Sequence, residues 1–130
     1  KIDRGEVNGI IGEILRKEGK KLGEITILFL TDDEILKINK EYLGHDYFTD
    51  VITFGYSRKS KISGDILIGV DTVRKNAAYY KKGFEDEIRR VIVHGMLHLI
   101  GYNDLDPAKK RVMKGKENAY LACWNKIVNG

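Results

Sequence analysis

Apolar residues recur along the chain with helical spacing in some stretches and with the character of strands in others. The first helical stripe ends near Gly19, a residue suited to a helix terminus. Residues 24–30, EITILFL, are β-branched and aromatic, which predicts a mostly buried strand. A second helix should begin at the capping box of Thr31 and Glu34 and end at Gly44. Its inward-facing side chains are predicted to be Ile35, Ile38 and Tyr42.

Two further strands are predicted in the middle of the chain. Residues 50–56, DVITFGY, and residues 62–70, ISGDILIGV, are separated by the short polar stretch 57–61. Two neighbouring strands with such a short connection favour a β-hairpin. Asp71 is then predicted to cap a helix that extends through Tyr80.

The remaining chain predicts two helices. Gly83 precedes a helix that starts near Phe84, and from Val91 onward this helix is apolar on all sides, so it should be central and buried. Pro107 begins the last helix. Its core stripe is predicted to be Val112, Ala119, Tyr120, Cys123 and Ile127. This order of elements predicts an α+β fold in which a small mixed β-sheet packs against several helices.

Composition excludes some classes of protein without choosing a function. A chain of 130 residues, 42% of them hydrophobic and 32% charged, should form a single globular domain over residues 1–130. No apolar run approaches the ~20 residues needed to span a bilayer, so no membrane association is expected. The one cysteine, Cys123, fits the reducing cytoplasm and is best interpreted as a small buried hydrophobe. The net charge of +4 is a mild bias that would suit a polyanion.

The segment 91–104, VIVHGMLHLIGYND, contains a candidate metal site. His94 and His98 are four residues apart, so they lie on one helix face and can share one ion. Gly101 favours the end of the helix, and a chain that turns back there can bring Asp104 to the same ion. Three protein ligands leave a position for water, which is the layout of a catalytic site. The alternative is a pair of histidines packed in the core.

Three side chains after the glycine could supply the third ligand. Asn103 is neutral and a poor zinc ligand. Asp106 immediately precedes Pro107 and is well placed to cap the last helix. Asp104 lies ten residues after His94, where zinc peptidases put their third histidine, and is the preferred candidate.

The spacing is also similar to that of zinc peptidases at the first ligands, which read His-Glu-x-x-His. Gly95 stands where those enzymes carry the glutamate general base. Without that carboxylate, peptide hydrolysis by the usual route has no proton acceptor beside the metal. A metal-dependent hydrolase of another substrate remains an alternative.

A longer pattern resembles a known family. Residues 94–104, HGMLHLIGYND, are similar to the signature of the YbeY family of metal-dependent endoribonucleases, His-Gly-x-Leu-His-Leu-x-Gly-Tyr-Asp-His. Two shorter stretches match in order, TDVITF at 49–54 and GDILIG at 64–69. With the preceding EYLGHD, the resemblance extends from about residue 24 to the end of the chain.

The resemblance implies a single-strand-directed endoribonuclease with one divalent transition metal, Zn2+ being the first expectation. It also implies maturation of the 3′ end of small-subunit ribosomal RNA, ribosome quality control, and single-stranded RNA or the ribosome rather than DNA as partner. The attacking group would be either a water activated by the metal or an adjacent 2′-hydroxyl. Two positions depart from the family: Asp104 replaces the usual third histidine, and Leu43 stands where members commonly carry an arginine.

Basic residues in the predicted hairpin loop could contact RNA. Arg58, Lys59 and Lys61 put three cations there, where they either bind phosphates or form an ordinary solvated turn. A further alternative is a non-enzymatic, ribosome-associated RNA-binding module in which the metal only braces the fold. The leucine at position 43 keeps that alternative open.

The loop before the TDVITF strand adds one catalytic candidate. The resemblance places this loop beside the metal, so His45 could contact a phosphate or transfer a proton. Tyr47 and Phe48 in the same loop either stack on unpaired bases or pack the loop against the protein.

Overall fold

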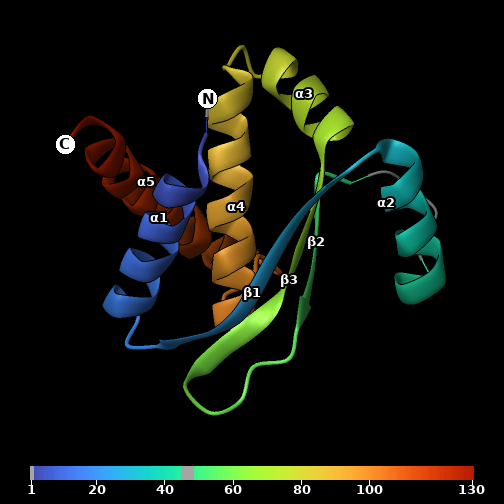
Figure 1. Cartoon of the computed structure of the whole chain (residues 1–130). Coiled ribbons are helices and arrows are strands. Elements are labelled where there is room, and N and C mark those ends of the chain that lie inside the picture. The colour runs from blue at the N-terminus through green and yellow to red at the C-terminus, as the bar shows by residue number, and fades with distance from the viewer. Residues whose placement is uncertain (1, 45–48) are drawn as a thin grey trace.

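A computed structural model describes residues 2–44 and 49–130 of the chain. Within those residues the elements follow the order α1 (Arg4–Lys17), β1 (Lys21–Leu30), α2 (Asp32–Ile38), the π-helix η1 (Asn39–Leu43), β2 (Val51–Gly55), β3 (Lys61–Gly69), α3 (Val70–Tyr79), α4 (Phe84–Ile100) and α5 (Pro107–Asn129) (Figure 1). The predicted α+β fold is confirmed. None of the described helices is long and apolar enough to cross a membrane.

The sheet has the strand order β1-β3-β2, so the last strand in sequence lies in the middle. Strand β3 pairs with β2 in antiparallel orientation, which confirms the predicted hairpin. It pairs with β1 in parallel orientation, which makes the sheet mixed. Strand β3 has a neighbouring strand at each edge, and both of its faces are packed. Ile66 and Ile68 belong to the main core on one face, and Leu67 packs with Ile35 of α2 on the other.

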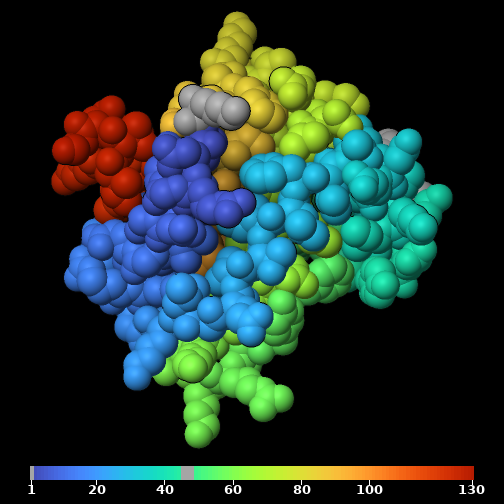
Figure 2. All heavy atoms as spheres, viewed as in Figure 1, coloured from blue at the N-terminus to red at the C-terminus, as the bar shows by residue number. Residues whose placement is uncertain are grey.

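Helix α4 is the central element of the main core. The sheet lies on one side of it, and α1 and α5 lie on the other (Figure 1). In the view of Figure 2, α1 and β1 cover much of α4. Three of its side chains, Ile92, Met96 and Leu97, are fully buried, which confirms the prediction of a central helix. Helix α5 contributes two aromatic side chains to this core, Tyr120 and the fully buried Trp124.

Strand β1 differs from its prediction as a mostly buried strand. It is an edge strand, and Leu28 and Phe29 are 46% and 55% exposed. Ile25 and Ile27 pack partly against the main core, and Leu30 packs partly against the smaller cluster around Ile35. The apolar residues predicted a strand correctly. This strand lies at the edge of the sheet, however, so part of its side chains remain in solvent.

The helix after β1 begins as predicted and then changes its period. The capping box at Thr31 is formed, and Ile35 is fully buried. From Asn39 to Leu43 the chain is a π-helix, which ends at Gly44 with φ of 67°. The wider π-turn shifts the angular position of the following side chains. As a result Asn39 is buried while Tyr42 is 68% exposed, so the prediction that Tyr42 faces inward is wrong.

Asp71 has a different role from the predicted one. The N-cap of α3 is Gly69, and Asp71 lies within the first turn of that helix. Its carboxylate accepts a hydrogen bond of 2.9 Å from the backbone N–H of Asp32, in the first turn of α2. The hydroxyl of Thr72 donates to the carboxylate of Asp32 at 3.1 Å. Asp71 therefore caps a neighbouring helix, a pairing that depends on the tertiary fold.

A buried carboxylate joins three separate parts of the chain. Glu18, at the end of α1, has a side chain only 9% exposed. It accepts hydrogen bonds from the hydroxyl of Tyr102 at 2.7 Å, from the hydroxyl of Tyr120, and from the ammonium of Lys116 at 3.1 Å. Tyr102 directly follows Gly101, the residue that ends α4. Glu18 thus ties the segment after α4 to α1 and α5.

This network should make stability depend on pH at both extremes. Burial opposes ionisation of Glu18, but hydrogen bonds from Tyr120, Tyr102 and Lys116 outweigh it and place the pKa of Glu18 below its ordinary value. Stabilisation from Glu18 is therefore complete above its unfolded-state pKa of about 4.3 and is lost as the pH falls through the lower folded-state pKa. Burial, the hydrogen bond to Glu18 and the charge of Glu18 raise the pKa of Tyr120. The stabilisation from Tyr120 is therefore complete below its unfolded-state pKa of about 10 and is lost as the pH rises through the higher folded-state pKa.

We expect Glu18→Gln to lower the free energy of unfolding at neutral pH by about 1–3 kcal/mol, because buried donors lose a charged acceptor. The same variant should flatten the acid limb of the stability curve. Urea unfolding at a series of pH values measures both effects, with the exposed Glu41→Gln as control. An acid limb as steep in Glu18→Gln as in the wild type would contradict this account.

Candidate metal centre and its cleft

The structure brings together the three predicted metal ligands. His94 and His98 lie one turn apart on α4, with their Nε2 atoms 2.9 Å from each other. Gly101 ends the helix with φ of 126°, a conformation that favours glycine, and the chain then turns back. The turn brings Asp104 to the two imidazoles, and the ligand atoms of all three residues lie within 4.8 Å of one another.

This donor set fits a divalent transition metal. Two imidazole nitrogens and a carboxylate oxygen are ordinary ligands for such ions, at about 2.0–2.2 Å for zinc. Atoms bound to one ion at those distances lie within about 4.4 Å of one another, close to the span of this cluster. All three residues are half-buried, so the cluster could bind a metal that remains accessible to a substrate.

The other oxygen-bearing side chains of the loop have structural roles. Asp106 is the N-cap of α5 and accepts from the backbone N–H of Lys109 at 2.8 Å, as its position before the proline predicts. The side-chain oxygen of Asn103 accepts from the backbone N–H of Leu105 at 3.1 Å. Both groups are therefore engaged in shaping the loop that presents Asp104.

Helix α5 contributes an acid that the sequence did not reveal. The predicted core stripe is confirmed at Tyr120, which is buried, and in part at Cys123, which is half-buried against the core; it is wrong at Val112, Ala119 and Ile127, which are exposed. The buried stripe contains Met113, Glu117, Tyr120 and Trp124. A charged residue in a core stripe contradicts the hydrophobic pattern, and it requires a charged partner when buried.

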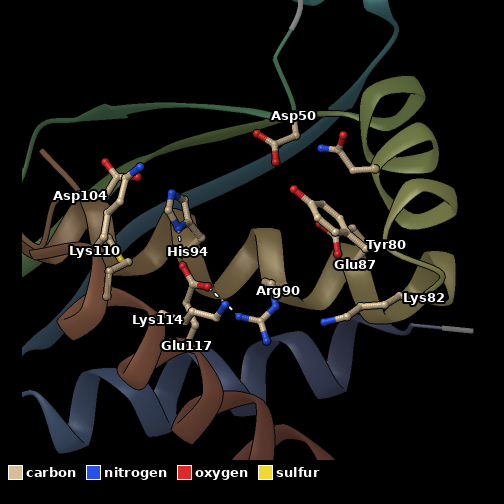
Figure 3. Close-up of a pocket in the computed structure, with 12 residues that line it drawn as sticks. Asp50, Tyr80, Lys82, Glu87, Arg90, His94, Asp104, Lys110, Lys114 and Glu117 are labelled. Carbon is tan, nitrogen blue, oxygen red and sulfur yellow. Dashed lines mark hydrogen bonds and ion pairs between the residues drawn. The ribbon is translucent and has the colours of Figure 1, made fainter. Parts of the chain in front are cut away.

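Glu117 has two such partners on α4. One carboxylate oxygen lies 2.5 Å from Nδ1 of His94, and the other accepts from the guanidinium of Arg90 at 2.8 Å (Figure 3). A second guanidinium nitrogen donates to the side-chain oxygen of Asn118 at 2.8 Å. Burial opposes ionisation of Glu117, but the bonds from His94 and Arg90 outweigh it and lower the pKa of Glu117.

The two histidines have different electrostatic surroundings. Burial alone would lower the pKa of His94, but the hydrogen bond and charge of Glu117 outweigh it and raise the pKa. Burial and the neighbouring His94 lower the pKa of His98. The neutral form of His98 that a metal requires is therefore favoured, while the orientation of His94 is set by Glu117.

An open cleft of about 430 Å³ adjoins this centre. Figure 3 shows its walls: Asp50 precedes β2, Tyr80 follows α3, and further side chains come from α4 and α5. The described lining residues with charged side chains are Asp50, Lys82, Glu87, Arg90, Asp104, Lys110, Lys114 and Glu117.

The sequence analysis also did not predict two further acids of this cleft, Asp50 and Glu87. Burial raises the pKa of Asp50, and burial followed by the charge of Asp50 raises the pKa of Glu87. Asp50 belongs to the TDVITF stretch, so the family resemblance offered a signal for it. For Glu87 the available signal was its helical spacing from Arg90 and His94 on one face of α4.

Several predicted residues do not lie at this cleft. Arg58 and Lys59 are in the β2–β3 connection and Lys61 begins β3, at the opposite end of β2 from Asp50, and none of the three lines the cleft. Leu43, at the end of the π-helix, does not line it either. The predictions for His45, Tyr47 and Phe48 concern a segment outside the described residues.

Gly95 is explained by packing as well as by chemistry. It faces β3, where a Cβ atom at this position would lie 2.8 Å from Cγ2 of Ile66. Any larger side chain would push α4 away from the sheet, so a glutamate in the position of the peptidase base has no room. The close packing of α4 against β3 at Gly95 therefore excludes a glutamate from this position.

Comparison with known proteins agrees with this geometry. A family model described as Endoribonuclease YbeY matches residues 1–125. The chain belongs to the YbeY family. Family members are metal-dependent, and the three converging side chains of α4 and its following loop are the residues that could bind the ion in this member.

Similar proteins with this family name occur in several bacteria. The endoribonuclease YbeY of Phocaeicola vulgatus is 46% identical over 93% of this chain and 88% of its own length. That of Porphyromonas gingivalis is 44% identical over 98% of this chain and 85% of its own length. A solution structure from Thermotoga maritima superposes with a TM-score of 0.70 at 28% identity, covering 96% of this chain and 83% of that one.

The close approach of α4 to the sheet can be tested with two glycines. We expect Gly95→Ala to lower the free energy of unfolding by about 1–3 kcal/mol, because the added methyl group overpacks the contact with Ile66. Gly115→Ala on α5 is the matched control, since its Cβ would meet no atom within 4 Å. That variant should gain about 0.5–1 kcal/mol. Equal effects in urea unfolding would contradict the packing argument.

The assignment of the third ligand can be tested by metal content. We expect Asp104→Ala to lose the bound metal and Asp104→His to retain it, because an imidazole can replace the carboxylate. Asp106→Ala should keep the metal and lose only about 1 kcal/mol of stability, as expected for an N-cap. Elemental analysis and urea unfolding measure these outcomes. An Asp106→Ala protein without metal beside a fully loaded Asp104→Ala protein would reverse the assignment.

Proposed function

We propose that this chain is an endoribonuclease that cleaves single-stranded RNA with one divalent transition metal, Zn2+ being the first expectation. The observation that carries the proposal is the cluster of His94, His98 and Asp104 beside an open cleft whose lining includes four basic side chains. Relatives at 44–46% identity are named endoribonucleases, which supports RNA as the substrate. The three residues are proposed to hold the ion.

The ion's part in the reaction is that of a Lewis acid, which acidifies a water or hydroxyl and polarises a phosphoryl oxygen. The chain's own residues orient the two partners of that chemistry. Asp104 and the two histidines hold the ion at the edge of the cleft, and the cleft's cations hold the RNA backbone beside it. His45 stays a candidate for contacting phosphate or transferring a proton.

The charges of the cleft support a polyanionic substrate once a metal is bound. Among the described residues, four carboxylates (Asp50, Glu87, Asp104, Glu117) and four basic side chains (Lys82, Arg90, Lys110, Lys114) line it. These charges balance, so a divalent ion makes the total positive. Burial raises the pKa of Asp50, and burial with the charge of Asp50 raises the pKa of Glu87.

Three of these cations are available for phosphate groups. Lys82, Lys110 and Lys114 make no ion pair with any of the described residues, whereas Arg90 is bound to Glu117. Lys110 and Lys114 are four residues apart on α5, which places them on one face of the helix. We propose that they contact the RNA backbone close to the metal, without reading its sequence.

An aromatic side chain in the cleft supports a preference for unpaired RNA. Tyr80 lines the cleft, is largely exposed, and makes an edge-to-face contact with Tyr79. A base can stack on such a ring only when it is free of its own stack in a duplex. The hairpin cations Arg58, Lys59 and Lys61 are proposed as a more distant contact with the same strand.

The finer biological role follows from the family resemblance. We propose that the substrate is ribosomal RNA, in particular the 3′ end of the small-subunit RNA, and that the protein acts in the cytoplasm on or near the ribosome. Its place in ribosome quality control is part of the same proposal. These statements rest on the resemblance and on the relatives' names.

The activity can be tested with one RNA sequence in two forms. We expect metal-loaded protein to cleave the single strand faster than the same strand annealed to its complement, and chelator to abolish both reactions. Readdition of Zn2+ or Mn2+ should restore cleavage, and His98→Ala should remain inactive. Equal or faster cleavage of the duplex would contradict the proposed substrate, and full activity in chelator would contradict the metal.

The two sets of cations can be distinguished by salt dependence. For single-stranded RNA the logarithm of the binding constant falls with the logarithm of salt concentration by about 0.7 per phosphate contact. Lys110→Gln with Lys114→Gln should therefore reduce the slope by about 1.4 and also slow cleavage. Replacing Arg58, Lys59 and Lys61 by glutamine should reduce the slope with a smaller effect on cleavage. A slope unchanged by the α5 pair would exclude its phosphate contacts.

A further inference from the structure

Glu117 is a buried acid whose two oxygens are both engaged. Its side chain lies between α4 and α5, and the residue is 8% exposed. Oε1 accepts from Arg90 at 2.8 Å, and Oε2 lies 2.5 Å from Nδ1 of His94 (Figure 3). The guanidinium is in turn held by Asn118 at 2.8 Å. The carboxylate therefore has a fixed position relative to the imidazole.

This contact determines which imidazole nitrogen of His94 is free. An ionised carboxylate can only accept hydrogen bonds, so Nδ1 must be the nitrogen that carries the proton. In the neutral ring Nε2 is then left with a lone pair. That atom faces Nε2 of His98 at 2.9 Å, within the cluster that includes Asp104.

We propose that Glu117, held by Arg90, is a positioning residue that keeps His94 in the tautomer with Nε2 available to the metal. The inference rests on the proposed metal site. A hydrogen bond from the second ring nitrogen of a metal-binding histidine orients the ring, and its loss typically costs 10–100-fold in metal affinity. Glu117 acts through His94 and is not one of the three residues that converge on the proposed metal position.

The same contacts argue against other roles for Glu117. A general base needs a carboxylate oxygen within reach of the reacting group, whereas Glu117 is buried and its two oxygens are directed at Arg90 and at Nδ1 of His94. A fourth metal ligand would have to give up either Arg90 or His94. A purely structural ion pair with Arg90 would explain the burial, but it would not require the second oxygen to meet Nδ1.

Glu117→Gln separates the positioning role from packing, because it preserves shape and changes one acceptor into a donor. The amide oxygen should turn toward Arg90, since the guanidinium is always charged and can only donate. The NH2 group then faces Nδ1 of His94 and favours the tautomer with the proton on Nε2. We expect Zn2+ affinity, measured by chelator competition, to fall about 10–100-fold.

A second substitution should restore the interaction. In Arg90→Met with Glu117→Gln the guanidinium is absent, so the amide oxygen can rotate to accept from Nδ1 of His94. We expect this double variant to bind Zn2+ more tightly than Glu117→Gln alone. Asn118→Ala is the comparison variant, because it removes the outer partner of Arg90 and leaves the contact between Glu117 and His94 intact, so it should lower Zn2+ affinity much less than Glu117→Gln does.

The tautomer itself can be measured without metal or RNA. Nitrogen-15 NMR of the metal-free wild type, at a pH where both rings are neutral, should show His94 protonated on Nδ1. In Glu117→Gln the proton should move to Nε2. Protonation of wild-type His94 on Nε2 would overturn the inference whether or not the protein cleaves RNA. Wild-type Zn2+ affinity in a folded Glu117→Gln protein, or an equal loss in the double variant, would also overturn it.

Discussion

The contact between α4 and β3 is the constraint on which the rest of the structure depends. At Gly95 the helix lies so close to the sheet that an added Cβ would come within 2.8 Å of Ile66. This contact fixes the rotation of α4 about its own axis, because one face must present a glycine to the strand. With that rotation fixed, His94 lies at the wall of the open cleft with His98 one turn further along α4, and Asp104 and α5 can meet them there.

The polar contacts around α4 depend on this packing. Helix α5 crosses α4 and contributes an acidic residue where a hydrophobic one would be expected, and that residue is neutralised by Arg90 and His94. Burial strengthens such interactions and makes each unpaired charge costly. The arrangement therefore orients His94, one of the proposed metal ligands, while Lys110 and Lys114 on the same helix as Glu117 make no ion pair with the described residues.

A buried polar contact of Glu18 also supports the loop that carries Asp104, the proposed third ligand. Tyr102 lies between Gly101, which ends α4, and Asp104, and its hydroxyl is bound by Glu18 at the end of α1. A loop with one anchored residue loses less conformational freedom when it delivers a ligand. Residues far apart in the sequence thus cooperate to place one carboxylate.

The sequence by itself determined the α+β class, the hairpin, the capping box at Thr31 and the pairing of two histidines four residues apart, because these features depend on local periodicity and local hydrogen bonds. It could not determine which strand lies at the edge, the direction in which Tyr42 points after a π-turn, or the partner of Asp71. The role of Glu117 was decided only by the tertiary structure. A helical pattern assigns charged residues to solvent, and only the approach of α4, with Arg90 and His94, supplies the charges that make burial of this acid favourable.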